Sequence, residues 1–134
     1  MNRLSGTVAA VESSAAMSLV EVDVEGDIFS SLVLETSRTN PDLVPGRRIG
    51  IFFKETEVSI AKNLSGQISL RNRMNAVVKK IEPGKILTKI FLDYKGNEII
   101  SIITTKSSRR MDLKEGDAVE ALVKTTEVSL WHTI

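Results

Sequence analysis

The second half of the chain carries a set of hydrogen-bond donors whose types suit an oxyanion site. Its members are Ser69, Leu70, Arg71, Asn72, Thr104, Ser107 and Lys124. A tetrahedral dianion taken out of water needs donors for most of its oxygen lone pairs, because an unpaired buried charge is very costly. Hydroxyl groups and successive backbone amides form such a donor-rich concavity, and one lysine offsets part of the negative charge.

The chain also repeats itself at a constant offset of seventy residues, without a gap. The offset places Asn2-Arg3 on Asn72-Arg73 and Gly26 on Gly96. The two copies end alike, with Lys-Glu-Thr-Glu-Val-Ser at 54–59 and Lys-Thr-Thr-Glu-Val-Ser at 124–129. A period of this size is too long for a solenoid unit, so each copy is predicted to be one small folded module.

The donor set is not duplicated with the rest of the repeat. Thr104 falls on Leu34, Arg71 falls on Met1, and Ser69 falls before the first residue. The first copy therefore keeps only part of the set. We predict a secondary group of ligand-binding residues, two from the first copy and one from the second. This group is Ser37, Lys54 and Thr125. We predict a degenerate module at 1–62, a linker at 63–68 and a ligand-binding module at 69–134.

A structural explanation of the same residues is also open. Serine and threonine often satisfy backbone groups in turns and at the start of a helix, so Ser69, Thr104 and Ser107 could have only that role. Lys124 could be a solvated lysine at a strand end, and its match to Lys54 could reflect a structural need shared by both copies. The ordered joint pattern favours the oxyanion site.

Strand periodicity dominates the elements that must position these residues. Apolar and polar residues alternate loosely, and Gly-containing turns at 25–27 and 95–97 separate the runs. The predicted first-copy strands are 4–11, 18–24, 28–34, 48–53 and 58–61, and the second copy repeats this order. A short helical turn closed by glycine is expected at 37–46 and 107–116, and Pro41 should shorten the first of these. The prediction is all-β, with two tandem five-stranded OB-like barrels, each carrying one short helical turn.

Composition excludes several classes of protein. Eighteen basic against seventeen acidic residues give a net charge of only +1, which argues against a non-specific nucleic-acid clamp. The chain has no cysteine and no apolar run long enough to span a membrane, so we expect a cytoplasmic location and no membrane partner. Each half is near the lower size limit for independent folding, so the copies should share a core or associate with other chains.

Ser-x-Arg-Asn, then Thr-x-x-Ser and Lys-x-x-x-Val, in this order, resemble the Mop-type (TOBE) molybdate-binding domains. The resemblance covers essentially the whole chain. It implies that Ser69, Thr104 and Ser107 offer hydroxyls, that Leu70 and Arg71 offer backbone N–H groups, and that Lys124 supplies positive charge. It further implies molybdate or tungstate as the ligand, no organic cofactor, and sites between the subunits of a homo-oligomer, either a trimer or a dimer.

Two other functions compete with a molybdate store, buffer or sensor. The chain could be a ligand-sensing accessory domain that acts with a separate DNA-binding or transporter partner, because it has no helix-turn-helix or P-loop of its own. It could also be a single-stranded nucleic-acid module, but its four Phe, one Tyr and one Trp are scattered rather than arranged as a stacking platform. No acid/base pair is recognisable, so no enzymatic activity is predicted.

Overall fold

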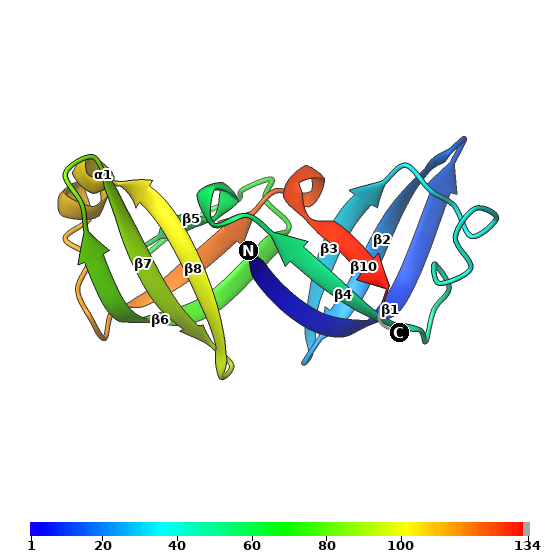
Figure 1. The fold of residues 1–134 in the computed structure, drawn as a ribbon, viewed down its shortest axis with the longest axis horizontal. Coiled ribbons are helices and arrows are strands. Elements are labelled where there is room, and N and C mark those ends of the chain that lie inside the picture. Colours follow the sequence, from blue (N-terminus) through cyan, green and yellow to red (C-terminus); the bar gives the residue numbers. More distant parts are fainter. Residues whose placement is uncertain (133–134) are drawn as a thin grey trace.

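Two curled five-stranded antiparallel sheets lie side by side in the computed structural model, which describes residues 1–132 (Figure 1). The first-half strands are β1 (Asn2–Ser14), β2 (Met17–Val24), β3 (Asp27–Val33), β4 (Arg48–Phe53) and β5 (Ser59–Ala61). The second-half strands are β6 (Asn72–Pro83), β7 (Leu87–Tyr94), β8 (Asn97–Thr104), β9 (Ala118–Val123) and β10 (Ser129–His132). The helices are α1 (Thr105–Arg110) and the 3-10 turns η1 (Glu55–Glu57) and η2 (Thr125–Glu127). The predicted all-β class with two five-stranded units is confirmed.

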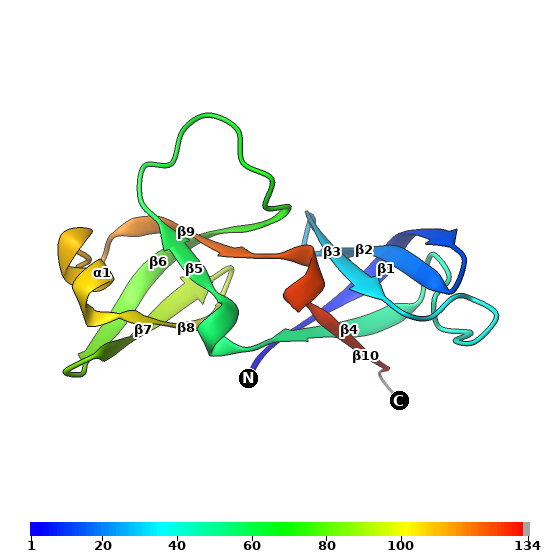
Figure 2. The ribbon, with the colours of Figure 1, turned by 90° about the horizontal axis from the view of Figure 1, so that it is seen from above.

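The sheets do not follow the boundary between the two sequence copies. Their strand orders are β10-β4-β1-β2-β3 and β5-β9-β6-β7-β8, so each sheet takes its fifth strand from the other half. Figure 2 shows β4 continuing through η1 into β5 of the opposite sheet. Each copy is therefore completed by a strand of the other, an exchange that was not predicted from the sequence. The exchanged strand pairs with β4 or β9 and satisfies a sheet edge that would otherwise be exposed.

One hydrophobic core runs through both halves. Alternate residues of β1 and β6 are buried, as period-two strands require. The buried side chains form a single cluster that includes Phe29 and Phe53 from the first copy and Met74 and Tyr94 from the second. The sequence expectation that two undersized halves share a core is therefore confirmed.

The predicted hairpin turns are present at both copies of the glycine motif. Glu25 and Gly26 have φ of 50° and 95°, and Lys95 and Gly96 have φ of 50° and 84°. Positive φ at both central residues matches the twist of antiparallel strands, and glycine adopts this conformation without steric cost. The two turns meet, because Tyr94 Oη donates to Asp27 at 2.5 Å and Lys95 Nζ donates to the Glu25 carbonyl at 2.7 Å.

The two copies differ most between their third and fourth strands. The second copy forms α1 here, whereas 37–46 forms hydrogen-bonded turns that include bonds from the Thr39 and Asn40 N–H groups to the Thr36 carbonyl. Pro41 aligns with Met111, the C-cap residue of α1, whose N–H bonds to the Ser107 carbonyl. Proline has no N–H for this bond and disfavours the helical conformation of the residue before it, so it favours turns in the first copy. Within residues 1–132, no helix is long and apolar enough to cross a membrane.

Gly50 tests the pairing of the exchanged strand β10. It lies opposite Trp131, and a Cβ at Gly50 would overlap the indole ring. We expect Gly50→Ala to lower the free energy of unfolding by about 1–3 kcal/mol through overpacking. Urea unfolding followed by Trp fluorescence measures this. Glu120→Ala is the matched control at the equivalent register position, opposite Ala61, and an equal loss in both variants would contradict the prediction.

Asp27 tests the contact between the hairpin turns. The hydrogen bond from Tyr94 and then the ammonium group of Lys95 lower the pKa of Asp27 below its usual 3.8. A lowered pKa adds stability above the unfolded value, and this stability is lost as pH falls through the folded value. We expect Asp27→Asn to unfold at lower urea than the unmodified chain at pH 7, and the difference to shrink as pH falls below 3.8. A difference that stays constant as pH falls would contradict this origin.

Candidate oxyanion site

Two of the predicted donor segments lie next to each other at the middle of the molecule. The first residue of β6, Asn72, is paired with the last residue of β9, Val123. Because the strands are antiparallel, Arg71 just before β6 and Lys124 just after β9 lie at the same end of this strand pair. Lys124 is exposed and has extended backbone angles that lead into η2.

Asn72 has a buried structural role at this position. Its side chain is fully buried, and its Oδ1 accepts from the Ser30 N–H at 2.7 Å while its Nδ2 donates to the Ser30 carbonyl at 3.0 Å. The amide therefore bonds to β3 of the other copy as a neighbouring strand would. These bonds join the start of the Ser-x-Arg-Asn motif to the opposite sheet.

Ser30 is a residue of this region that sequence reasoning missed. Its hydroxyl lies 2.7 Å from the hydroxyl of Thr125, the residue that follows Lys124. The available signal was the comparison of copies, because Ile100 occupies the equivalent position at an offset of seventy. Strand exchange was not predicted from the sequence, so nothing indicated that a β3 residue would lie beside this segment.

The remaining part of the Ser-x-Arg turn is exposed. Ser69 lines an open hollow of 570 Å³ together with 66–68 and Arg73. The Arg71 guanidinium donates to Glu21 of the first copy at 3.2 Å. The side chain of Arg71 is thus engaged with a carboxylate, and the backbone of this turn is the part that suits an anion.

Thr104 and Ser107 lie elsewhere in the same chain. Thr104 is the N-cap of α1 and Ser107 lies in its first turn, at the outer end of the second-copy sheet, whereas η2 lies near the middle of the molecule (Figure 1). Thr104 Oγ1 accepts from the Ser107 N–H at 3.1 Å and donates to Ser107 Oγ at 2.9 Å. Thr104 therefore caps the helix, which is the structural alternative that the sequence left open. Within one chain, this pair lies far along the fold from Lys124 (Figure 1).

The equivalent first-copy position keeps the backbone contacts but changes their chemistry. Asn2 bonds to the N–H and carbonyl of Ile100, both at 2.8 Å. Lys54 is followed by Glu55 where the second copy has Thr125. The Glu55 carboxylate pairs with the Met1 amino group, and Ser37 lies exposed in the turns after β3.

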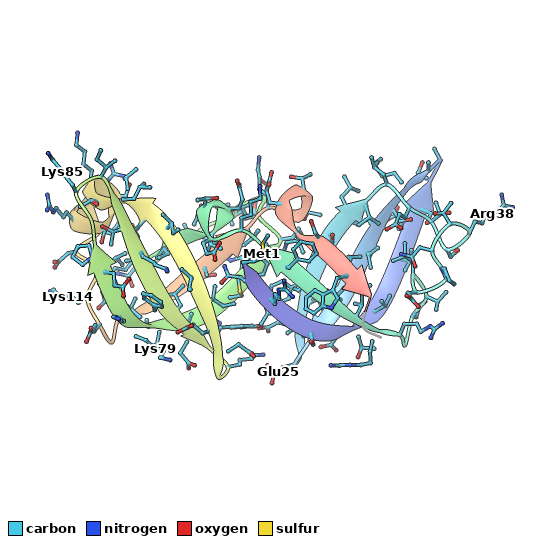
Figure 3. The ribbon with its side chains drawn as sticks, viewed as in Figure 1. Met1, Glu25, Arg38, Lys79, Lys85 and Lys114 are labelled. Carbon is cyan, nitrogen blue, oxygen red and sulfur yellow. The ribbon has the colours of Figure 1, made fainter. Side chains whose placement is uncertain are left out.

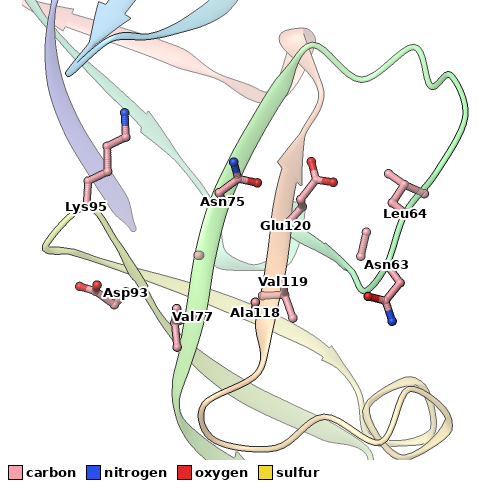
Figure 4. Close-up of a pocket in the computed structure, with 11 residues that line it drawn as sticks. Asn63, Leu64, Asn75, Val77, Asp93, Lys95, Ala118, Val119 and Glu120 are labelled. Carbon is pink, nitrogen blue, oxygen red and sulfur yellow. The ribbon is translucent and has the colours of Figure 1, made fainter.

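A separate groove of 490 Å³ lies on the outer face of β6 and β9 and does not include the predicted donors (Figure 4). Asp93 and Glu120 contribute two carboxylates to its lining, and Glu120 is paired with Arg73 at 2.7 Å. The single lysine of the lining, Lys95, bonds instead to the Glu25 carbonyl and to Asp27. This groove therefore does not have the charge that an oxyanion requires.

Comparison with known proteins gives a consistent family. The TOBE domain model matches residues 68–130. Molybdenum-pterin-binding protein 1 of Clostridium pasteurianum is 34% identical over 64 residues, which are 47% of this chain and 94% of that protein. A solved structure of the cytoplasmic molybdate-binding protein ModG with molybdate bound is 29% identical, with a TM-score of 0.92. The match covers 98% of this chain and 96% of that one.

A longer relative contains the same region. The molybdenum import ATP-binding protein ModC of Rhizobium etli is 32% identical over 130 residues, and the match covers 91% of this chain. The chain spans only about a third of the length of such ModC proteins, with 37% of the Rhizobium etli protein covered.

Substitution of Asn72 tests the junction between the halves, meaning the two bonds of the Asn72 side chain to the backbone of Ser30. We expect Asn72→Ala to lower the free energy of unfolding by about 1–3 kcal/mol, because it leaves two buried backbone groups of Ser30 without their partner. Chemical denaturation measures the loss. Asn75→Ala, at an exposed position of the same strand, should change stability by less than about 0.5 kcal/mol. Similar losses for the two variants would argue against the role of the junction.

Proposed function

Since this chain belongs to the family of Mop-type (TOBE) molybdate-binding proteins, we propose that it binds molybdate or tungstate as an intact oxyanion. The observation that carries the proposal is the adjacency of the Ser-x-Arg-Asn turn and Lys124 at one end of the β6–β9 pair. The full-length likeness to ModG, which binds molybdate, supports it. The role is storage, buffering or sensing of the anion.

The chemistry of the second copy (69–134) suits such a ligand. The Ser69 hydroxyl and the backbone N–H groups of Leu70 and Arg71 are donors, and Lys124 supplies the charge. Charge-assisted hydrogen bonds contribute about 1.5–3 kcal/mol each, so five or six of them support tight binding after the costs of association. The oxygens of the anion are already bound to its metal atom, and the protein needs only to supply donors. No catalytic step is part of the proposal.

We place the complete site between chains. Thr104 and Ser107 lie at the outer end of the molecule, so they cannot join Arg71 and Lys124 of the same chain without a large rearrangement. A second copy that presents its Thr104 end to the middle of the first, where Arg71 and Lys124 lie, would complete the donor set. A homo-oligomer, a trimer or a dimer, in the cytoplasm provides this arrangement.

An accessory role is the second candidate. The ModC relatives contain a region similar to 91% of this chain within a longer ATP-binding protein, which favours a sensing function beside a transporter or a DNA-binding partner. Affinity capture from a lysate with and without molybdate distinguishes the two roles, because a free-standing store should retain no partner of either class.

Single-stranded nucleic acid fits the surface less well. Figure 3 shows Lys79, Lys85 and Lys114 projecting around the second-copy sheet, with Arg38 at the opposite end of the molecule. Basic side chains are therefore dispersed, whereas a backbone-tracking groove needs them in one stripe.

Titration calorimetry with molybdate, tungstate and sulfate tests the proposed function. The metal oxyanions should release or absorb heat at micromolar protein, and a lack of heat with both would refute the proposal. Lys124→Ala should weaken binding about tenfold or more, the equivalent of one charge-assisted hydrogen bond. Lys54→Ala is the matched control and should have little effect, because the first copy lacks the Ser-x-Arg turn and the threonine. Equal losses would show that the first copy contributes to the site.

A further inference from the structure

We infer that Ser30, a residue of the first copy, is a positioning residue for the oxyanion site of the second copy. This inference rests on the proposed function. Ser30 lies on β3 and is 2% exposed, so it is not a direct contact for an anion in solution. Its role follows from the two segments that it joins.

Ser30 contacts both donor segments at once. Its backbone N–H and carbonyl hold the Asn72 side chain, at 2.7 and 3.0 Å, and Asn72 directly follows Arg71. Its hydroxyl lies 2.7 Å from that of Thr125, which directly follows Lys124. One buried residue therefore fixes the distance between the Ser-x-Arg turn and the lysine.

The turn that carries Lys124 depends on this contact. Lys124 is the residue before η2, and its side chain forms no hydrogen bond that caps this helix. Among the described hydrogen bonds, the Ser30–Thr125 pair is the one that ties the first side chain of η2 to the opposite sheet. A site that holds its donors in place before the ligand arrives loses less entropy on binding.

The equivalent contact of the first copy shows which bonds serve folding and which are specific to the candidate site. Asn2 makes the same two backbone bonds to Ile100 that Asn72 makes to Ser30, so these bonds serve the junction in both halves. The hydroxyl pair has no counterpart, because Ile100 replaces Ser30 and Glu55 replaces Thr125. The bond between the two hydroxyls therefore supports only the contact beside the Ser-x-Arg turn.

Molybdate calorimetry on the full chain tests this role. Ser30→Ala and Thr125→Val each remove the hydroxyl pair and should weaken binding about fivefold to tenfold, as expected for one hydrogen bond. Ser30→Thr keeps a hydroxyl at this position and should restore affinity to within about twofold. The double variant Ser30→Ala/Thr125→Val should bind no more weakly than either single variant, because both changes remove the same bond.

Ser101→Ala is the matched structural control. The Ser101 hydroxyl, on β8, is buried and donates to the Val58 carbonyl of the first copy at 2.6 Å, near Lys54 and away from Lys124 in the sequence. This variant should lower the melting temperature but leave molybdate affinity unchanged.

Additive losses in the double variant, or wild-type affinity in Ser30→Ala, would overturn the inference while the proposed function stands. If Ser30→Ala does not fold, Thr125→Val decides the question from the other side of the bond. Absence of heat with the unmodified chain would overturn the proposed function itself.

Discussion

Pairing of the exposed edges of β4 and β9 is the constraint on which the rest of the structure depends. Each half of the chain has a four-stranded sheet with an edge that needs a partner, and the last strand of the other half supplies it. The same exchange merges the two small cores into one cluster. It also carries η2 of the second copy across to β3 of the first, where Thr125 meets Ser30. Folding and the candidate site therefore share one topological cause.

The molecule is symmetric in its backbone contacts and asymmetric in its donors. Asn2 and Asn72 hold the two halves together with the same pair of bonds. Around this symmetric frame, the second copy has Arg71 and Thr125 where the first has Met1 and Glu55. In the first copy the Glu55 carboxylate pairs with the Met1 amino group, whereas the second copy has the Thr125 hydroxyl at the equivalent position. A few substitutions in a duplicated frame thus separate a scaffold half from a binding half.

Much of the local structure could be predicted because it depends on neighbouring residues. Alternation predicted the strands, and the two glycine motifs predicted turns that have positive φ at Gly26 and Gly96. Pro41 predicted a shorter helical turn in the first copy, and the structure has only hydrogen-bonded turns there. Partner choice was different: a period of two shows which side chains share a face but not which strand lies beside it. Ser30 was missed for this reason.

The sequence by itself determined the all-β class, the duplication and the chemical nature of the donor set, since these depend on residue types and their spacing along the chain. Only the tertiary structure decided that the copies exchange their final strands, that Arg71 and Lys124 are neighbours, and that Thr104 caps α1 at a distance from both. These features depend on which edges pair and which faces bury each other. Such long-range choices are made by the whole core and not by any local segment.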